Sequence, residues 1–283
     1  MNIAIIGPGR IGSTFAFFLS RAGHAVTLIA RGRRLEELRR DGAIVTIKGD
    51  RAEVAVAATL DPKTPFDLVL VTVVAHQVDA VLPELKACSA KTVLFMFNTF
   101  EKGDRLRDAV GAGRFASGFP AMAAFFVDGR LKAQVDGPGM VTTLSSAPWA
   151  EVLAKAGMPT EVEPDMDSFL RSHVAFVVPL MAAAMLTWQR KQNITWAEAS
   201  KLTGALVEAL ELVRGLGHTL APRMVALLAA LPAFVLTATI WLFTRTAANR
   251  ALGEFGPAET RALIDAMTAA APGKTTRLLA IRP

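Results

Sequence analysis

The chain has 283 residues, of which 52% are hydrophobic and 20% charged, and its formal net charge is +6. This length suffices for two domains, and the apolar content excludes a disordered chain. The single cysteine, Cys88, excludes an internal disulfide and a cysteine-based zinc site, and the four scattered histidines offer no metal-ligand spacing. No long run of Lys and Arg is present, so a small anionic ligand explains the charge better than nucleic acid does. We therefore expect neither a metal site nor a nucleic-acid partner.

The most informative segment is a glycine-rich turn close to the N-terminus. A short apolar run leads into Gly7-Pro8-Gly9-Arg10-Ile11-Gly12, and a helical pattern follows. This order of strand, glycines and helix is the context that the dinucleotide-binding fingerprint requires. The first glycine permits the tight turn, the second lets a diphosphate approach the backbone, and the third lets helix and strand pack closely. The N–H groups at the start of the helix favour phosphate, so we predict that Gly7, Gly9, Arg10, Ile11 and Gly12 bind a dinucleotide.

The residue after the second predicted strand, 25–30, indicates which dinucleotide binds. Folds that prefer NAD carry an acid about 20 residues after the glycines, but this chain has Arg31 near that point. A guanidinium suits a 2′-phosphate by its charge and its forked donors. We therefore predict NADPH as the cofactor, with Arg31 and Arg34 as candidate phosphate ligands. In the alternative interpretation, the arginines between positions 33 and 40 form only a solvated helix face.

Further strands and helices alternate through the first half of the chain. Residues 68–73 and 92–97 form continuous apolar runs, as expected of strands buried on both faces. A short strand is predicted over 54–57 and a helix over 78–85. Repeated units of this kind build a Rossmann-type, doubly wound parallel sheet, in which ligands bind beyond the carboxyl ends of the strands. Thr72 and Asn98 stand at two of these ends, so we add both to the predicted cofactor-binding residues.

The pattern changes after about residue 120. Asp128-Gly129 follows an apolar run and predicts a hairpin with a type I′ turn. A short strand over 140–144 and a helix over 147–155 complete an antiparallel extension of the sheet. The stretch 159–167 reads as acidic and irregular, and the remainder is helical. We therefore expect a dinucleotide-binding domain over 1–165 and an all-helical substrate or dimerisation domain over 166–283.

One apolar segment bears on cellular location. Residues 224–243 carry no charge and are about as long as a membrane-spanning helix. Pro232 lies in the middle, where it would break or start a helix. We expect a buried helix pair rather than a membrane span. Because the first predicted strand begins at once, we also expect no signal peptide and a cytoplasmic protein.

The chain resembles the ketopantoate reductase (2-dehydropantoate 2-reductase) family. The resemblance depends on the glycine motif, on the strand that ends in Arg31, on the stretch 71–77 and on Phe97-Asn98. The order of the parts also fits, with an NADPH-binding fold, an antiparallel extension and a helical C-terminal domain. The resemblance implies an NADPH-dependent reductase of a small 2-keto acid or related carbonyl, with its active site in the cleft between the domains. The family is often dimeric, so a homodimer is consistent with the resemblance.

Several positions depart from the pattern of that family. The family has a Lys where this chain has Val74, and its catalytic Lys and two later Asn residues align with Leu170, Val174 and Val178. Asn98 is the one polar site residue that carries over. These replacements favour a less polar ketone or other bulky carbonyl as substrate. They also leave open a different class of function, a catalytically inactive NADPH-binding regulator or scaffold.

Reduction of a carbonyl needs a proton donor and a group that stabilises the developing oxyanion. The chain contains no Tyr, which excludes a Tyr–Lys proton relay. We name Asn98 and His173 as catalytic candidates and consider Arg171 as a carboxylate ligand. Each has a purely structural alternative: a turn residue for Asn98, a core histidine for His173 and a solvated helix position for Arg171. The exposed position expected for His76 at the start of a helix makes it a weaker candidate.

Overall fold

The computed structural model describes residues 1–246, 249, 252–253 and 257–283, and these form two folded units. The first unit consists of Met1–Phe97 and Gly103–Met166. The second consists of Asn98–Lys102 and Asp167–Pro283, so a short piece that follows a strand of the first unit belongs to the helical one. Each unit has its own hydrophobic core and is described separately.

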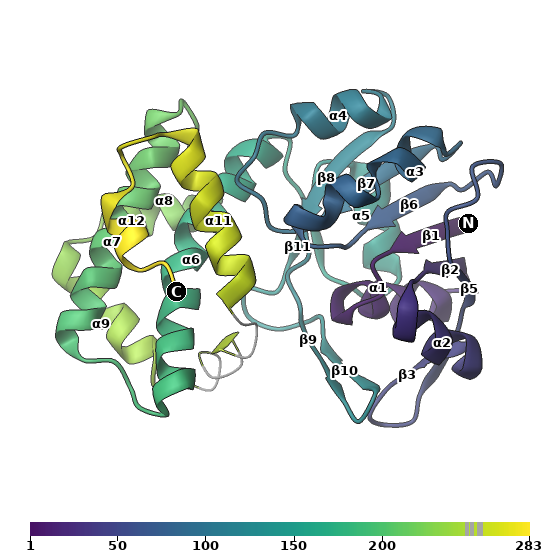
Figure 1. Cartoon of the computed structure of the whole chain (residues 1–283), viewed down its shortest axis with the longest axis horizontal. Coiled ribbons are helices and arrows are strands. Elements are labelled where there is room, and N and C mark those ends of the chain that lie inside the picture. Colours follow the sequence, from purple (N-terminus) through teal and green to yellow (C-terminus); the bar gives the residue numbers. More distant parts are fainter. Residues whose placement is uncertain (247–248, 250–251, 254–256) are drawn as a thin grey trace. The chain divides into compact units, whose positions relative to one another are not determined.

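An eight-stranded sheet with the order β12-β11-β8-β7-β6-β1-β2-β5 forms the first unit (Figure 1). Its strands are β1 (Asn2–Ile6), β2 (Ala25–Ile29), β5 (Ala55–Ala57), β6 (Leu68–Val71), β7 (Thr92–Met96), β8 (Phe115–Phe119), β11 (Thr142–Leu144) and β12 (Thr160–Val162). Neighbouring strands are parallel, except that β11 runs antiparallel to β8. This arrangement confirms the predicted Rossmann-type sheet with an antiparallel extension.

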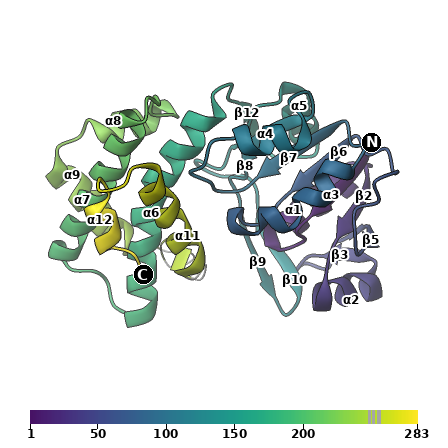
Figure 2. The same cartoon turned by 45° about the horizontal axis from the view of Figure 1, so that its top comes forward.

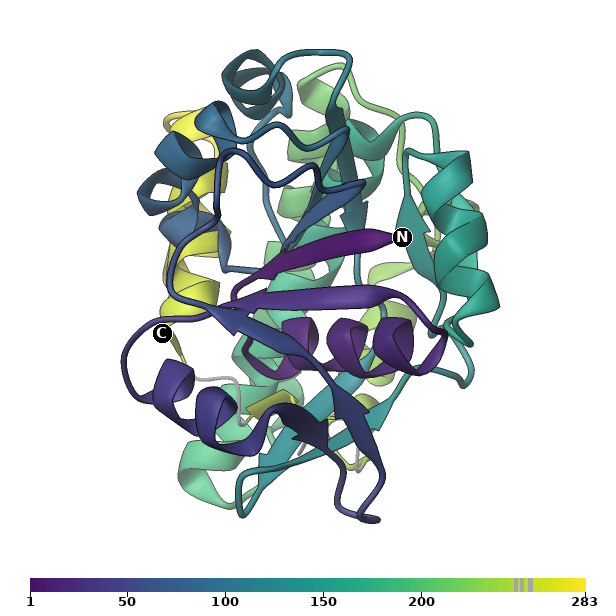
Figure 3. The ribbon, with the colours of Figure 1, turned by 90° about the vertical axis from the view of Figure 1, so that its right-hand side faces the viewer.

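Alternating side chains of the central strands fill two separate cores, one on each face of the sheet. In β1, Ile3 and Ile5 join the core on one face, whereas Ala4 and Ile6 join the core on the other. The first core also receives α1 (Arg10–Arg21) and α5 (Ala147–Lys155), and Figure 3 shows α1 running along β1 and β2. The second receives the 3₁₀ helix η1 (Ala75–Ala80), α3 (Leu82–Ala87) and α4 (Asp104–Val110). Burial on both faces explains why β6 and β7 are continuous apolar runs.

Two small antiparallel sheets complete the first unit. The predicted hairpin is present as β9 (Ala123–Val127) and β10 (Arg130–Gln134), and its turn residues Asp128 and Gly129 have φ of 48° and 76°. Positive φ at both central positions is the signature of a type I′ turn. Strands β3 (Ala43–Val45) and β4 (Arg51–Glu53) pair nearby, after α2 (Gly32–Asp41), and β3 lies beside β10 (Figures 1 and 2).

Two sequence predictions in this unit were wrong in detail. The single helix expected over 78–85 is η1 followed by α3, because Pro83 lies in the first turn of α3 and cannot continue the preceding helix. The stretch 159–167, expected to be irregular, contains β12, which pairs in parallel with β11. Its three residues and exposed Glu161 suit an edge strand, which is short and charged in many sheets.

The second unit is helical. Its described helices are α6 (Met166–Arg190), α7 (Trp196–Gly215), α8 (Arg223–Ala229), α9 (Ala233–Phe243), α11 (Pro257–Ala270) and α12 (Thr276–Ala280). Helix α7 begins in a capping box, in which Thr195 and Glu198 satisfy each other's backbone N–H groups. Glu208 on α7 accepts hydrogen bonds from the backbone of Arg277 and Leu278, which fixes the start of α12 on α7.

The apolar segment 224–243 is divided between α8 and α9, whose axes differ by 117°. Pro232 is the N-cap of α9, as its position in the sequence predicted. Burial is only one-sided: Leu236 and Ile240 lie in the core, whereas Met224 and Phe234 are 63% and 69% exposed. Among the described residues, Met166–Arg190 is long and apolar enough to cross a membrane, but 72% of its apolar window is buried inside the protein.

Candidate functional site

The glycine-rich turn lies between the end of β1 and the start of α1. Gly7 has φ of +91°, and the Gly9 backbone N–H donates to its carbonyl oxygen at 2.8 Å, which closes the turn. At Gly12 a Cβ would lie 2.4 Å from the Gly7 oxygen and 2.5 Å from Thr72 Oγ1. The helix therefore starts as close to the strand as a residue without a side chain allows.

Gly9 differs from the two other glycines because the space around it is open. A Cβ built at Gly9 meets no heavy atom within 4 Å. Open space beside the backbone, next to the first turn of a helix that has no acidic residue there, suits an anionic group. Arg10 and Ile11 form this first turn. The residues present thus fit the diphosphate of a dinucleotide.

Thr72, predicted to bind the cofactor, contacts the glycine-rich turn. Its Oγ1 lies 2.8 Å from the carbonyl oxygen of Gly7 and 3.0 Å from that of Ile6, and it donates to one of them. Thr72 follows β6, the neighbour of β1, so this hydrogen bond ties the turn to a second strand. The observed role of Thr72 is to position the turn.

Arg31 lies where β2 ends and α2 begins, as the N-cap residue of α2. Its guanidinium forms an ion pair with Glu84 on α3, and its side chain is 58% exposed. Glu84 also accepts a hydrogen bond from the Leu60 backbone, at 2.9 Å, which holds the carboxylate in place. Sequence reasoning missed this acid, because nothing in the spacing of Arg31 and Glu84 indicates that they meet.

Arg34 is more deeply placed and reaches the glycine-rich turn itself. Nε donates to the carbonyl oxygen of Pro8 and Nη2 to Ser13 Oγ, both at 3.2 Å, and the guanidinium lies over the ring of Phe126. These contacts link α2 and the β9–β10 hairpin to the turn. Arg34 therefore combines a positive charge beside the predicted phosphate site with a structural role.

Asn98, the predicted polar residue after β7, contacts an acid that sequence reasoning did not assign. Its Nδ2 donates to Glu259 Oε1 at 3.0 Å, across 161 residues of chain. The carboxylate can only accept, so this contact fixes the orientation of the amide and leaves Oδ1 as a buried acceptor without a partner. Only one sequence feature pointed to Glu259: Pro257 begins α11, and this acid follows in the first turn of the helix.

His173, the second catalytic candidate, is partly buried on α6. Its ring stacks on Phe169 with 6.4 Å between centroids, and burial lowers the pKa of the imidazole from 6.5 to about 4. The ring is therefore neutral at pH 7, and a neutral imidazole is a weak acid. These properties argue against an imidazolium at His173 as the proton donor.

The positions predicted from the sequence to align with polar residues of the family belong to the core. Leu170 is 5% exposed, and Val174 and Val178 are 0% exposed. Both valines pack in the core of the helical unit together with Phe100. They stabilise the unit and do not line an open site. His76, by contrast, is exposed on η1.

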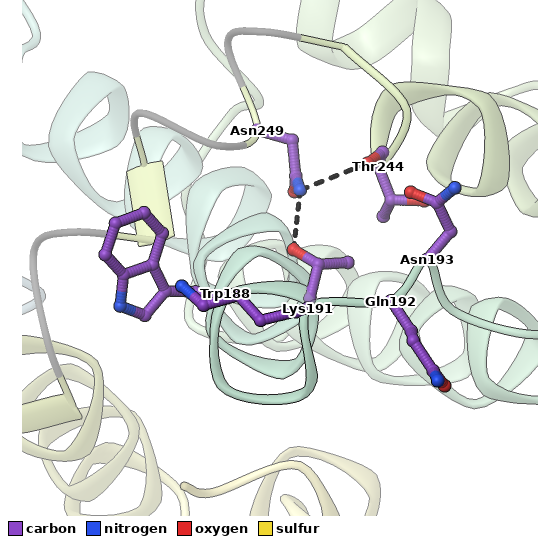
Figure 4. A pocket seen from close by; sticks show the side chains of 7 residues that line it. Trp188, Lys191, Gln192, Asn193, Thr244 and Asn249 are labelled. Carbon is purple, nitrogen blue, oxygen red and sulfur yellow. Dashed lines mark hydrogen bonds between the residues drawn. The ribbon is translucent and has the colours of Figure 1, made fainter.

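The helical unit also contains a cavity of about 470 Å³ near the end of α6, lined by Thr187, Trp188, Lys191, Gln192, Asn193, Thr244 and Asn249. Figure 4 shows Asn249 directed toward Thr244, with Trp188 and Lys191 nearby. The Nδ2 of Asn249 donates to Thr187 Oγ1 at 2.7 Å and to the Thr244 carbonyl oxygen at 3.2 Å. None of the residues predicted from the sequence as site residues lines this cavity.

The contrast between Gly9 and Gly12 leads to a pair of substitutions. Gly12→Ala forces the turn and helix apart, and we expect it to lower the free energy of unfolding by about 1–3 kcal/mol. Gly9→Ala should change that free energy by no more than about 1 kcal/mol. It should nevertheless weaken binding of the predicted cofactor, NADPH, by roughly 10- to 100-fold, because the methyl group would occupy the predicted diphosphate position. Chemical denaturation and fluorescence titration measure the two effects, and unchanged NADPH binding by Gly9→Ala would contradict the assignment.

The lowered pKa of His173 predicts a pH dependence of stability. A neutral imidazole is favoured in the folded state, so its contribution is complete above pH 6.5 and is lost as the pH falls toward 4. Between pH 7 and 4.5 the wild type should lose about 2–3 kcal/mol more free energy of unfolding than His173→Gln. His76→Gln, at an exposed histidine, is the control and should behave as the wild type does. Parallel pH curves for wild type and His173→Gln would refute the prediction.

Comparison with known proteins agrees with these features. A family model described as ketopantoate reductase PanE/ApbA matches residues 3–146, just over half of the chain. The 2-dehydropantoate 2-reductase of Vibrio cholerae is 32% identical over 141 residues, which span 48% of this chain and 43% of that protein. The alignment thus covers less than half of this curated relative.

Similarity of fold extends over the whole chain. The structure of 2-dehydropantoate 2-reductase from Geobacter metallireducens has a TM-score of 0.76 at 17% identity, over 100% of this chain and 98% of that one. D-mandelate dehydrogenase, solved with NADH and anilino(oxo)acetate, has a TM-score of 0.75 at 14% identity, over 100% and 96%. At these low identities the solved structures establish only the fold. The family model matches the sequence itself and therefore establishes the family. The chain belongs to the ketopantoate reductase PanE/ApbA family.

Proposed function

We propose that the protein is an NADPH-dependent oxidoreductase that reduces a small carbonyl compound, either a 2-keto acid or a less polar ketone. The observation that carries this proposal is the open backbone at Gly9, between a closed turn and the start of α1, in a chain of this family. A dinucleotide diphosphate is the group that such a turn accommodates. A cytoplasmic, metal-independent enzyme is consistent with this role.

The described side chains contribute binding and orientation. When bound, the reduced nicotinamide supplies the hydride. The buried Oδ1 of Asn98, held in orientation by Glu259, offers an acceptor to a hydroxyl group of the substrate or of the nicotinamide ribose. Because the chain has no Tyr and the His173 imidazole is neutral at pH 7, we propose water as the source of the proton that completes the alcohol.

The preference for NADPH depends on the balance of charge beyond β2. Arg31, Arg33 and Arg34 supply three positive charges there, Glu84 forms an ion pair with Arg31, and Glu37 forms ion pairs with both Arg33 and Arg34. Arg31 is the best-placed phosphate ligand, since its side chain is exposed whereas Arg34 is engaged with the turn. A 2′-phosphate would share or replace the carboxylate of Glu84 on this guanidinium.

Substitution of Arg31 should separate the two cofactors. Arg31→Ala removes charge-assisted hydrogen bonds and should weaken NADPH binding by about 1.5–3 kcal/mol while sparing NADH. Glu84→Gln frees the guanidinium and should leave NADPH binding equal or tighter. Arg33→Ala, at a side chain that is 90% exposed, is the matched control and should have little effect. Equal loss of NADPH and NADH binding by Arg31→Ala would refute the 2′-phosphate assignment.

The activity itself is tested by following NADPH absorbance with a panel of 2-keto acids, ketones and imines. We expect turnover of at least one 2-keto acid or ketone, and loss of that turnover in Gly9→Ala because the cofactor no longer binds. Saturable NADPH binding with no turnover of any compound would overturn the proposed reductase.

A second function, an NADPH-binding regulator or scaffold without catalysis, is favoured by one specific observation. The positions that the sequence resemblance aligns with the catalytic Lys and two Asn of the family hold Leu170 and two fully buried valines. Under this alternative, NADPH binds tightly, none of the panel is reduced, and binding changes the affinity for another macromolecule. The absorbance assay and an NADPH titration together distinguish it from the reductase.

A further inference from the structure

Arg171 differs from the other charged residues of the chain. Among the residues that the structure describes, it is the only Lys, Arg, Asp or Glu with a buried side chain, at 5% exposure. It lies near the start of α6, and its guanidinium lies over the ring of Phe100, with Cζ 4.9 Å from the ring centroid. Stacking on an aromatic face compensates a buried cation only in part.

The hydrogen-bonding groups of this guanidinium are not used by the described part of the chain. Nε is buried and has no hydrogen-bond partner. No described carboxylate forms an ion pair with Arg171, although Asp167, one turn earlier on α6, acts on it electrostatically. Burial lowers the pKa of the guanidinium, and Asp167 raises it, but an Arg remains charged at neutral pH. A buried guanidinium without a carboxylate beside it calls for an anionic partner.

The surroundings of Arg171 connect it to the polar pair of the helical unit. Phe100, on which it stacks, is two residues after Asn98 in the segment Asn98–Lys102. Asn98 holds Glu259 through Nδ2 and keeps Oδ1 as a buried acceptor without a partner. The segment therefore carries the ring on which the buried cation stacks and, two residues earlier, a buried acceptor without a partner. A 2-hydroxy acid, the product of 2-keto acid reduction, carries the complementary groups: a carboxylate for the cation and a hydroxyl donor for the acceptor.

We propose that Arg171 binds the carboxylate of a 2-keto acid substrate, which makes this chain selective for anionic 2-keto acids over neutral ketones. The planar fork of the guanidinium can pair with both oxygens of the carboxylate while its face rests on Phe100. The inference rests on the proposed reductase function and narrows its substrate class. Arg171 acts in binding and specificity, and the hydride chemistry does not pass through it.

The experiment compares two substrates that differ only in charge. Steady-state NADPH oxidation is measured with a 2-keto acid and with its primary amide, for wild type, Arg171→Met, Arg171→Lys and Arg190→Met. Arg190 lies at the other end of α6 in an exposed ion pair with Glu198, so Arg190→Met is the matched control. NADPH titration and circular dichroism of each variant verify the cofactor site and the fold.

We expect wild type to prefer the acid over the amide, and Arg171→Met to raise KM for the acid by about 10- to 100-fold with little change for the amide. Arg171→Lys should fall between them, because it keeps the charge and loses the fork. Equal effects on acid and amide, or equal use of both by wild type, would overturn the proposal. If Arg171→Met does not fold, the lysine variant and the wild-type preference decide the question.

Failure of the reductase function is recognised separately, as NADPH binding by wild type without oxidation by either compound. In that case, calorimetric titration of the 2-keto acid into NADPH-loaded wild type and Arg171→Lys tests the carboxylate site directly. Tighter binding to wild type would support the site, and equal or absent binding would refute it.

Discussion

The close approach of α1 to β1 at Gly12 is the constraint on which the nucleotide site depends. A Cβ at this residue would overlap the Gly7 carbonyl oxygen and the Thr72 hydroxyl, so the three groups can meet only around a glycine. Their contact aligns the first turn of the helix with the end of the strand and, through Thr72, with β6. The open space at Gly9 is a consequence, because the chain that has turned this tightly leaves its outer side uncovered. The anion site predicted here thus originates in packing, with the charge of Arg31 and Arg34 added around it.

Charge around this turn is organised by the same elements that build the fold. Arg34 anchors α2 to the turn and to Phe126 of the hairpin, which commits its donors, whereas Arg31 remains exposed. The sequence could predict that guanidinium groups follow β2, since this depends on position along the chain. It could not predict the ion pair with Glu84, because that contact depends on how α3 packs beside the end of β2. An acid thus lies beside the predicted 2′-phosphate site, although none occupies the sequence position where NAD-preferring folds carry one.

The features predictable from the sequence are those that local physics determines. Two-sided burial of β6 and β7, the type I′ turn at Asp128-Gly129 and the helix break at Pro232 follow from hydrophobic runs and backbone preferences. The division between η1 and α3 follows from the same backbone preferences. The apolar spacing predicted one continuous helix over 78–85, whereas Pro83 alone indicates the break. The contact between Asn98 and Glu259 could not be found in this way, because 161 residues separate the partners and only tertiary packing joins them.

Helix α6 shows how stability and chemistry compete for one helix face. Val174 and Val178 have no exposed surface, and burial of such a side chain contributes about 1.5–3 kcal/mol each. A lysine or asparagine at the same depth would need partners for its polar atoms and would cost free energy without them. The helix face that the sequence resemblance aligns with polar residues of the family therefore stabilises the core here. In the proposed reductase, the groups of this unit that we assign to the substrate are Arg171 near the start of the helix and Asn98 with Glu259. In the proposed reductase these groups would bind and orient an anionic substrate, and rate enhancement would arise mainly from the placement of the substrate against the cofactor.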